Sequence, residues 1–152
     1  MAEERAQTTG LEQMICFELY AASRAMTALY RPVLDDAGLT YPQYLVMRVL
    51  WHRGPVTVRD LSQILHLDSG TLSPLLKRLE TQHHIRRERG TPDERTVVIH
   101  LTDTGAQLEH RVADVPQQIV CALDLNLDEY RQLHHLLGRI SAATPHSSGK
   151  EH

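Results

Sequence analysis

The alternation of apolar and polar residues between residues 57 and 101 predicts two short helices followed by a two-stranded ribbon. Residues 57–66 and 69–80 each place apolar side chains on one face at helical spacing and polar side chains on the other. Because only Leu67 and Asp68 separate these two amphipathic helices, they must cross steeply, as in a helix-turn-helix. The apolar positions are Val58, Leu61, Ile64 and Leu65 in the first segment and Leu72, Leu75, Leu76 and Leu79 in the second.

The segment that follows predicts a β-hairpin with a charged tip. Residues 85–89 and 96–101 are strand candidates, the second rich in β-branched side chains, and residues 90–95 between them are turn formers. Such a wing can rest on a DNA backbone while Arg95 reaches into the adjacent minor groove. Asp93, two residues earlier, is expected to hold that guanidinium at a fixed angle.

The polar face of the second helix has the composition expected of a surface that contacts DNA. Its first turn is small and rich in hydroxyls, and two cations follow one to two turns later. Small residues permit close approach to base edges, hydroxyls donate to bases or phosphates, and a helix N-terminus attracts phosphate. A capped surface helix in any all-α protein would look similar, but the wing favours DNA binding. The predicted DNA-contacting residues are Ser69, Gly70, Thr71, Ser73, Pro74, Lys77, Arg78, Arg86, Asp93 and Arg95.

Because of Pro74, the sequence does not decide at which residue this helix begins. A helix that begins at Ser69 places Pro74 beyond its first turn, where proline removes one backbone hydrogen bond and costs about 3 kcal/mol in a helix interior. Either the helix begins near Ser73, or its N-terminal turn is distorted and presents Thr71 and Pro74 to DNA.

A long amphipathic helix is predicted before this core. It runs from about Leu11 to Tyr30, with a capping box at residues 9–12, and ends before Pro32. A short helical turn at 33–37 follows. The next helix covers residues 43–52, with Thr40 as its cap and Pro42 at its first helical position, and is expected to pack behind the helix-turn-helix.

Two further helices are predicted after the wing. Asp103 or Thr104 caps the first, which bends at Pro116 and continues to Leu123. Asn126 begins the second. Long apolar faces outside a small core need a cover, and a second copy of the chain is the simplest one. The expectation is a two-fold homodimer that reads a palindromic operator in double-stranded DNA.

Composition and charge refine this interpretation. A chain of 152 residues with 41% hydrophobic residues suits one globular domain, and no segment looks like a signal peptide or a membrane span, so we expect a cytoplasmic protein without membrane contact. The net charge is −3, but residues 53–100 hold eight Lys/Arg against six Asp/Glu, or +2. Because phosphate binding depends on locally placed cations, each protomer is expected to bind weakly and in a salt-sensitive way.

The ordered motifs resemble one family. The wing sequence Asp93-Glu-Arg95, followed by Leu101-Thr-Asp-Thr-Gly105, is similar to the wing and next helix start of MarR-type winged-helix regulators, over roughly residues 11–143. Residues 67–80 and Cys16 most resemble the OhrR-type sensors of organic hydroperoxides. The resemblance implies a mainly α (α+β) fold, a non-enzymatic repressor without a cofactor, and an organic hydroperoxide as inducer. It also favours the early start of the helix that contains Pro74.

The domain plan follows from the same elements. We expect a single MarR-like domain over residues 1–152, with the winged helix-turn-helix core at 33–101. The dimerisation helices are expected at 9–31 and 103–143, and a disordered tail at 144–152.

Cys16 is the candidate sensing residue. The thiolate is the reactive form of cysteine, and Tyr20, four residues on, places a hydroxyl on the same helix face. Tyr30 lies about 21 Å further along the helix axis, so it meets Cys16 only from another chain. The resemblance implies the same two tyrosines around a sensing cysteine. A lone cysteine on an apolar face is otherwise usually a small core residue.

Cys121 lies in a hydrophobic run and by itself looks more core-like still. OhrR-like proteins exist with one cysteine or with a second, resolving one, and Cys121 suits the second form. The resemblance then implies that oxidation of Cys16 to a sulfenic acid is followed by a disulfide with Cys121 of the partner subunit, which reorients the wings.

Three other functions stay open at the level of sequence: a ligand-released regulator, a thiol-dependent peroxidase, and a protein-interaction module, which specific operator binding would exclude as the main function. The same DNA-binding chain, with inert cysteines, could release DNA on binding a phenolic or apolar ligand in a cleft between the dimer helices and the winged helix. A thiol-dependent peroxidase would need an electropositive cysteine loop that the sequence does not offer. A metal site is not expected, because the adjacent pairs His83-His84 and His134-His135 point in different directions on a helix.

Overall fold

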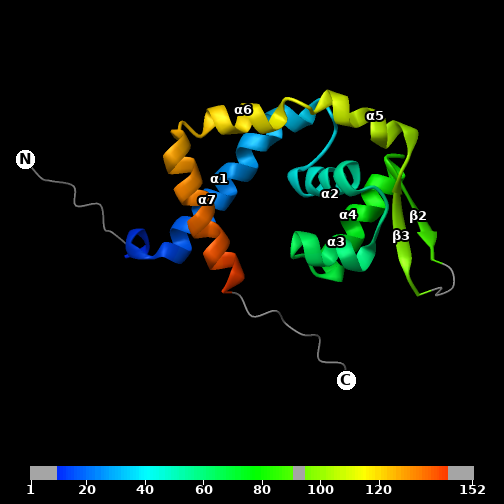
Figure 1. Cartoon of the computed structure of the whole chain (residues 1–152), viewed down its shortest axis with the longest axis horizontal. Coiled ribbons are helices and arrows are strands. Elements are labelled where there is room, and N and C mark those ends of the chain that lie inside the picture. The colour runs from blue at the N-terminus through cyan, green and yellow to red at the C-terminus, as the bar shows by residue number, and fades with distance from the viewer. Residues whose placement is uncertain (1–9, 91–94, 144–152) are drawn as a thin grey trace, which may run out of the picture. The chain divides into compact units, whose positions relative to one another are not determined.

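The computed structural model describes residues 10–90 and 95–143, which form two compact units, one ending at Val115 and one beginning at Pro116. Figure 1 shows the order of their elements. The first unit contains η1 (Leu11–Gln13), α1 (Ile15–Asp35), α2 (Tyr41–Arg53), β1 (Val56–Thr57), α3 (Val58–Leu65), α4 (Ser69–Thr81), β2 (Ile85–Arg89), β3 (Val97–Leu101) and α5 (Asp103–Arg111). Helix α6 (Val115–Ala122) starts at the boundary, and α7 (Leu127–Ala142) completes the second unit.

Helices α3 and α4 form the predicted helix-turn-helix. Thr57 caps α3 in a reciprocal box with Asp60, and His66 ends the helix in the left-handed conformation, at φ 53°. The hydroxyl of Ser62 donates to the carbonyl of Leu67 over 2.5 Å, which fixes the turn before α4. The two helices therefore lie at the positions that the apolar pattern indicates, and fully buried Leu61 and Leu72 face the core.

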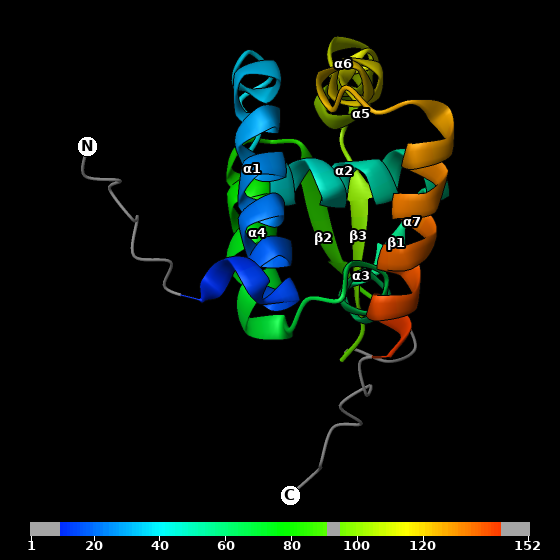
Figure 2. The same ribbon diagram turned by 90° about the vertical axis from the view of Figure 1, so that its left-hand side faces the viewer.

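Three short antiparallel strands form the wing sheet, in the order β1-β3-β2. Ile85 pairs with Leu101 and Arg89 with Val97, so the two wing strands align over their full length. The two-residue strand β1 pairs with β3 through Val56 and Ile99, and the sequence did not predict it. Figure 2 shows α2 running across the strands β2 and β3.

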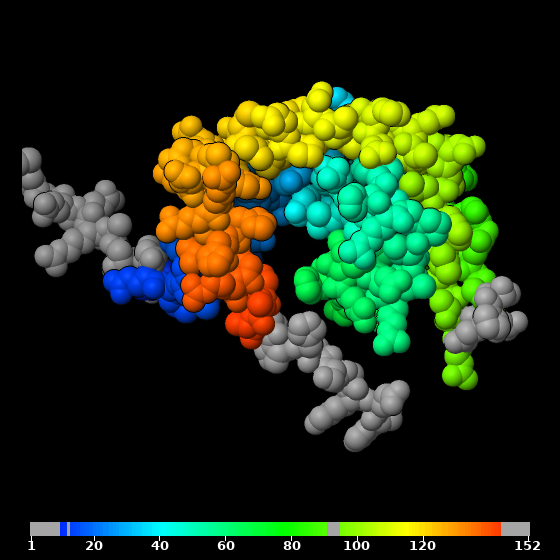
Figure 3. All heavy atoms as spheres, in the orientation of Figure 1, coloured from blue at the N-terminus to red at the C-terminus, as the bar shows by residue number. Residues whose placement is uncertain are grey.

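The core of the first unit forms where α2 meets the helix-turn-helix and the sheet. Leucine, valine and methionine side chains from these elements are almost completely inaccessible, and their burial at roughly 25 cal/mol per Å² is the main force that holds the elements together. Figure 3 shows α2, α3 and α4 as one packed body. The most buried members are Val46, Met47, Leu50, Leu61, Leu72, Leu79 and Ile99, joined by Leu34 near the end of α1.

The boundaries of the first long helix were predicted wrongly. A 3-10 turn comes first, Met14 is extended, and α1 begins at Ile15, so no single helix starts near Leu11. At the other end, α1 continues through Pro32 to Asp35, because the loss of one hydrogen bond near a helix end is offset by the burial of Leu34. The predicted cap residue Thr9 lies outside the described residues.

Smaller differences occur at two other helix starts. Pro42 is the second rather than the first residue of α2, which Thr40 caps in a reciprocal box with Gln43. Thr102, rather than Asp103 or Thr104, caps the helix after the wing. That helix ends at Arg111, and α6 begins at Val115, so the bend before Pro116 is a break between two helices.

The start of α5 is anchored against the loop between α4 and β2. The Thr102 hydroxyl donates to the carbonyl of His83 over 2.5 Å, and the Thr102 backbone N–H donates to the carbonyl of His84 over 3.1 Å. The Trp51 indole N–H donates to the Gly105 carbonyl over 2.9 Å, which ties α2 to the same point. Thus the Leu101–Gly105 motif joins the wing to the core.

Among the described residues, no helix is long and apolar enough to cross a lipid bilayer.

Candidate DNA-binding surface and thiol sites

Helix α4 begins at Ser69, as the early-start alternative requires. The Asp68 carboxylate accepts a hydrogen bond from the Thr71 backbone N–H over 2.7 Å, which satisfies one free donor of the first turn. This hydrogen bond from the Thr71 backbone holds the pKa of the Asp68 carboxyl below its ordinary value, so the cap is ionised at neutral pH. Pro74 lies inside the helix, where Leu72, Leu76 and Leu79 hold the opposite face in the core.

All the predicted α4 contacts lie on its exposed side. Leu72, Leu76 and Leu79 are buried, whereas every candidate between and around them is open to solvent. One helix therefore separates a leucine face that carries stability from a polar face that is available to a ligand. The exposed candidates are Ser69, Gly70, Thr71, Ser73, Pro74, Lys77 and Arg78.

A groove of about 510 Å³ runs beside this face. Thr71, Pro74 and Arg78 form its α4 side, and the first residues of α2 form the opposite side. The start of α2 is therefore part of the same surface, which the sequence analysis did not predict. The α2 and turn residues that line it are Thr40, Pro42, Gln43 and Leu67, and Leu75 completes the α4 side.

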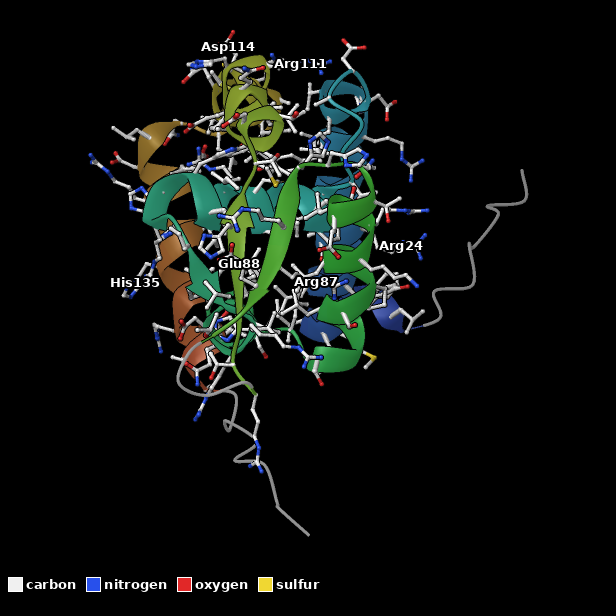
Figure 4. All side chains as sticks on the ribbon, turned by 90° about the vertical axis from the view of Figure 1, so that its right-hand side faces the viewer. Arg24, Arg87, Glu88, Arg111, Asp114 and His135 are labelled. Atoms are coloured by element: carbon white, nitrogen blue, oxygen red, sulfur yellow. The ribbon has the colours of Figure 1, made fainter. Side chains whose placement is uncertain are left out.

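The two faces of the wing strand β2 have different roles. On one face, Arg86 pairs with Glu88, and a Glu88 carboxylate oxygen lies 3.0 Å from Nε2 of His100 on β3. On the other face, Arg87 Nη2 lies 2.6 Å from the Glu80 carboxylate of α4. Figure 4 labels Arg87 beside α4 and Glu88 away from it. This ion pair therefore holds the wing against helix α4.

Three wing residues were predicted to contact DNA or to orient a contact, and the structure describes two of them, Arg86 and Arg95. Arg95 is exposed just before β3, and Arg86, although exposed, is already paired with a carboxylate. Asp93, predicted to orient Arg95, lies outside the described residues.

The contact between Arg87 and Glu80 gives a pH-dependent prediction. Hydrogen bonds from the Arg87 side chain hold the pKa of Glu80 below its ordinary value, so the contact stabilises the fold fully above about pH 4.5 and is lost as pH falls through the lowered pKa. Since both side chains are more than a third exposed, Arg87→Ala is expected to cost only about 1 kcal/mol at pH 7 and less near pH 3. Urea unfolding at both pH values measures the difference, with exposed Arg89→Ala as the control. An equal cost at both pH values would contradict it.

Cys16 lies in the first turn of α1, whereas the predicted helix from about Leu11 would place it in the second turn. The break at Met14 causes this difference, because α1 starts only one residue before the cysteine. The side chain is exposed. Its side chain therefore belongs to the first turn of the helix, where backbone N–H groups have no partner within the helix.

Both tyrosines predicted to lie near the sensing cysteine contact another side chain in the structure. Tyr20 is 56% exposed on α1, and Arg24 Nη1 donates to its hydroxyl over 3.0 Å. Tyr30 is half-buried, and its ring lies 4.3 Å from that of Tyr41 at the start of α2. Burial raises the pKa of Tyr41, so this hydroxyl remains protonated and able to donate. The sequence pattern does not indicate Tyr41, because this ring contact joins two separate helices.

Cys121 is exposed on α6, although the hydrophobic run around it suggested a core position. The Gln117 side-chain amide donates to its sulfur over 3.5 Å, from one turn earlier in the same helix. Both cysteines are therefore open to a reagent in their own units.

Each unit leaves a row of large apolar side chains exposed. Helix α7 has no buried residue, although its apolar positions follow one stripe. In α1, Ile15 is 67% exposed, next to Cys16. The exposed set is Leu11, Met14, Ile15, Phe17, Tyr20 and Leu29 in the first unit, and Val120, Leu127, Tyr130, Leu133, Leu136, Leu137 and Ile140 in the second.

Comparison with known proteins identifies the family. The sequence pattern of the family described as "Transcriptional regulator SarA/Rot" matches residues 28–112, which span α2, the helix-turn-helix and the wing. The chain belongs to this group of MarR-type winged-helix transcriptional regulators. The predicted family and the mainly α winged-helix fold are therefore confirmed. Because these proteins are regulators rather than enzymes, the peroxidase alternative has no support.

Individual relatives agree with this assignment. The organic hydroperoxide resistance transcriptional regulator of Bacillus subtilis is 45% identical over 127 residues, which cover 84% of this chain and 86% of the relative. The regulator MgrA of Staphylococcus aureus is 40% identical over 131 residues, or 86% of this chain and 89% of MgrA. The chain thus aligns over most of its length with winged-helix regulators.

A solved structure of reduced AbfR bound to DNA has a TM-score of 0.76 and 35% identity, and covers 87% of this chain and 90% of that one. AbfR comes from Staphylococcus epidermidis. A further structure, of disulfide-formed AbfR, has a TM-score of 0.59 and covers 87% of this chain and 88% of that one. The MarR-type fold of this chain is thus shared with a protein that has been solved both on DNA and in a disulfide form.

Proposed function

We propose that this MarR-type regulator is a homodimeric repressor that binds a palindromic operator and releases it when an organic hydroperoxide oxidises Cys16. The observation that carries the proposal is the position of Cys16, exposed in the first turn of α1, one turn before Tyr20 and on an uncovered apolar face. The 45% identity with a regulator of organic hydroperoxide resistance supports the choice of oxidant.

The DNA-binding half of the proposal rests on α4 and the wing. Small and hydroxyl-bearing residues occupy the exposed first turns of α4, and Arg78 lies further along the same side of the helix, at the groove. The contact between Arg87 and Glu80 keeps the wing beside this helix, so the helix can enter a major groove while Arg95 follows the minor groove. The similarity to DNA-bound AbfR supports the same use of the surface.

The dimer part of the proposal accounts for the uncovered helices. Exposed apolar residues on α1 and on α7 need a partner surface, and a second copy provides one with matching chemistry. If two α1 helices meet in antiparallel fashion, Cys16 of one chain approaches Tyr30 of the other. Tyr41 then brings a second phenol to the same place, because its ring packs against that of Tyr30.

The proposed chemistry has two steps. The Cys16 thiolate attacks the outer oxygen of the hydroperoxide, the O–O bond breaks, and the alkoxide leaves as an alcohol after taking a proton, so that a sulfenic acid remains on Cys16. The thiol of Cys121 of the partner subunit then attacks this sulfur, expels water and forms the disulfide. The exposure of both cysteines is compatible with this sequence.

Operator binding tests the proposal. DNA affinity of the wild type is expected to fall roughly 5- to 150-fold after one equivalent of cumene hydroperoxide, whereas Cys16→Ser keeps its affinity. Fluorescence anisotropy with a palindromic fragment from the DNA around the gene measures both. If wild type and Cys16→Ser respond equally, the redox sensor is wrong and a ligand-released regulator takes its place.

A second variant tests the resolving role of Cys121. Peroxide-treated wild type is expected to migrate as a crosslinked dimer on non-reducing gels, and Cys121→Ser as a monomer that carries a sulfenic acid. The same inter-subunit crosslink in Cys121→Ser would overturn the two-cysteine mechanism but leave the sensing role of Cys16 in place.

A further inference from the structure

One cation on α1 is fixed against the tyrosine that follows Cys16. Arg24 donates through Nη1 to the Tyr20 hydroxyl oxygen over 3.0 Å, and its Cζ lies 5.6 Å from the centre of the Tyr20 ring. Figure 4 labels Arg24 on α1. Because Cys16, Tyr20 and Arg24 are spaced four residues apart, they follow one stripe of the helix.

The direction of this hydrogen bond determines what Tyr20 can do. The guanidinium has no acceptor, so the phenol oxygen must accept, and the phenol O–H proton is left for another group. Donation by a charged group is stronger than donation by a neutral one, and it polarises the phenol so that its own O–H becomes a better donor. The contact with the ring also limits the rotation of the Tyr20 side chain.

We propose that Arg24 is a positioning residue for peroxide sensing: it holds and polarises Tyr20 so that the phenol donates to the leaving oxygen of the hydroperoxide. This inference rests on the proposed function. As the Cys16 thiolate takes the outer oxygen and the O–O bond breaks, the Tyr20 O–H donates to the departing alkoxide, which leaves as the alcohol. A proton from solvent then restores the phenol. The organic hydroperoxide is the only oxidant required.

A purely structural role makes a different prediction. Four-residue pairs on an exposed helix face contribute only a few tenths of a kcal/mol to helix stability. If Arg24 does no more than this, its replacement leaves the oxidation rate of Cys16 unchanged. If it acts through Tyr20, its replacement slows oxidation, and has no further effect once the phenol hydroxyl is absent.

The test is a double-mutant cycle on the rate of Cys16 oxidation. The Cys121→Ser background isolates the first step, and single-turnover reaction with cumene hydroperoxide is followed with a sulfenic-acid probe. Arg24→Gln and Tyr20→Phe are each expected to react roughly three- to tenfold more slowly, and the double variant no more slowly than Tyr20→Phe. Arg24→Lys keeps a charged donor and is expected to recover part of the rate.

Two controls separate the possible failures. Arg31→Gln removes the same charge from α1 almost two turns further on and is expected to react at the wild-type rate, and the thermal stability of the reduced Arg24→Gln protein is expected to change by no more than the few tenths of a kcal/mol of a helix-surface pair. Two results would overturn the role of Arg24 alone. Either Arg24→Gln is oxidised as fast as the Cys121→Ser parent protein, or the rate losses of Arg24→Gln and Tyr20→Phe add up in the double variant. A parent protein whose Cys16 resists hydroperoxide would overturn the sensor itself and this inference with it.

Discussion

Replacement of Gly105 with alanine is expected to lower the free energy of unfolding by at least about 3 kcal/mol. An added Cβ would lie 2.9 Å from the His84 carbonyl carbon and closer still to its oxygen, so backbone must move. That carbonyl already accepts from the Thr102 N–H, and the Gly105 carbonyl accepts from Trp51. A shift at this point therefore strains the start of α5, the loop before β2 and the α2 contact together.

Thermal and urea unfolding measure this loss, which corresponds to a fall in Tm of about 10 °C for a protein of this size. Gly138→Ala is the matched control, because nothing lies within 4 Å of the position of its added Cβ on α7. It is expected to leave stability unchanged or to raise it by up to about 1 kcal/mol, since alanine has the higher helix propensity. If Gly105→Ala lowers the free energy of unfolding by less than about 1 kcal/mol, the close approach of residue 105 to the His84 carbonyl is wrong.

The elements that local pattern decides were predicted well. Strand β2 has the predicted bounds, because the turn formers that begin at Gly90 mark its end. The leucine stripe of α4 was also identified, but its start at Ser69 was favoured only by the family resemblance. Local propensity disfavours proline at position 74, and the buried leucines of the helix outweigh that preference.

Errors occurred where tertiary contacts decide the local structure. Burial of Leu34 extends α1 through Pro32, and no residue near the proline signals this. Strand β1 has only two residues, which pair with Ile99 and Val98 of β3, more than 40 positions further along the chain. Such a strand has no sequence signal of its own.

The candidate site divides in the same way. The exposed residues of α4 follow from helical period, and Tyr20 from its spacing after Cys16. The ion pair of Arg87 with Glu80 joins a strand to a helix, and the ring contact between Tyr30 and Tyr41 joins two helices. Periodicity describes one element at a time, so contacts between elements remain outside its reach.

Replacement of Arg78 with glutamine is expected to weaken operator binding strongly, by roughly 30- to 150-fold in a dimer that loses two phosphate contacts. Arg78 lies nine residues after Ser69, about 13 Å along α4, whereas base contacts in helix-turn-helix proteins come from the N-terminal part of the recognition helix. Arg78 also lines the groove beside Thr40 and Pro42 of α2, where a phosphate backbone can pass. We therefore expect it to bind phosphate rather than a base.

The salt dependence of binding distinguishes the two roles. Loss of two phosphate contacts is expected to reduce the magnitude of the slope of log K against log salt concentration by about 1.8. The reduction is expected to be the same on operator DNA and on unrelated DNA. Ser73→Ala is the matched variant: Ser73 is exposed nearer the start of α4, so its loss is expected to reduce discrimination between operator and unrelated DNA without a change of slope. If Arg78→Gln instead reduces discrimination at an unchanged slope, Arg78 reads a base, and the recognition helix lies deeper in the groove than its small N-terminal residues indicate.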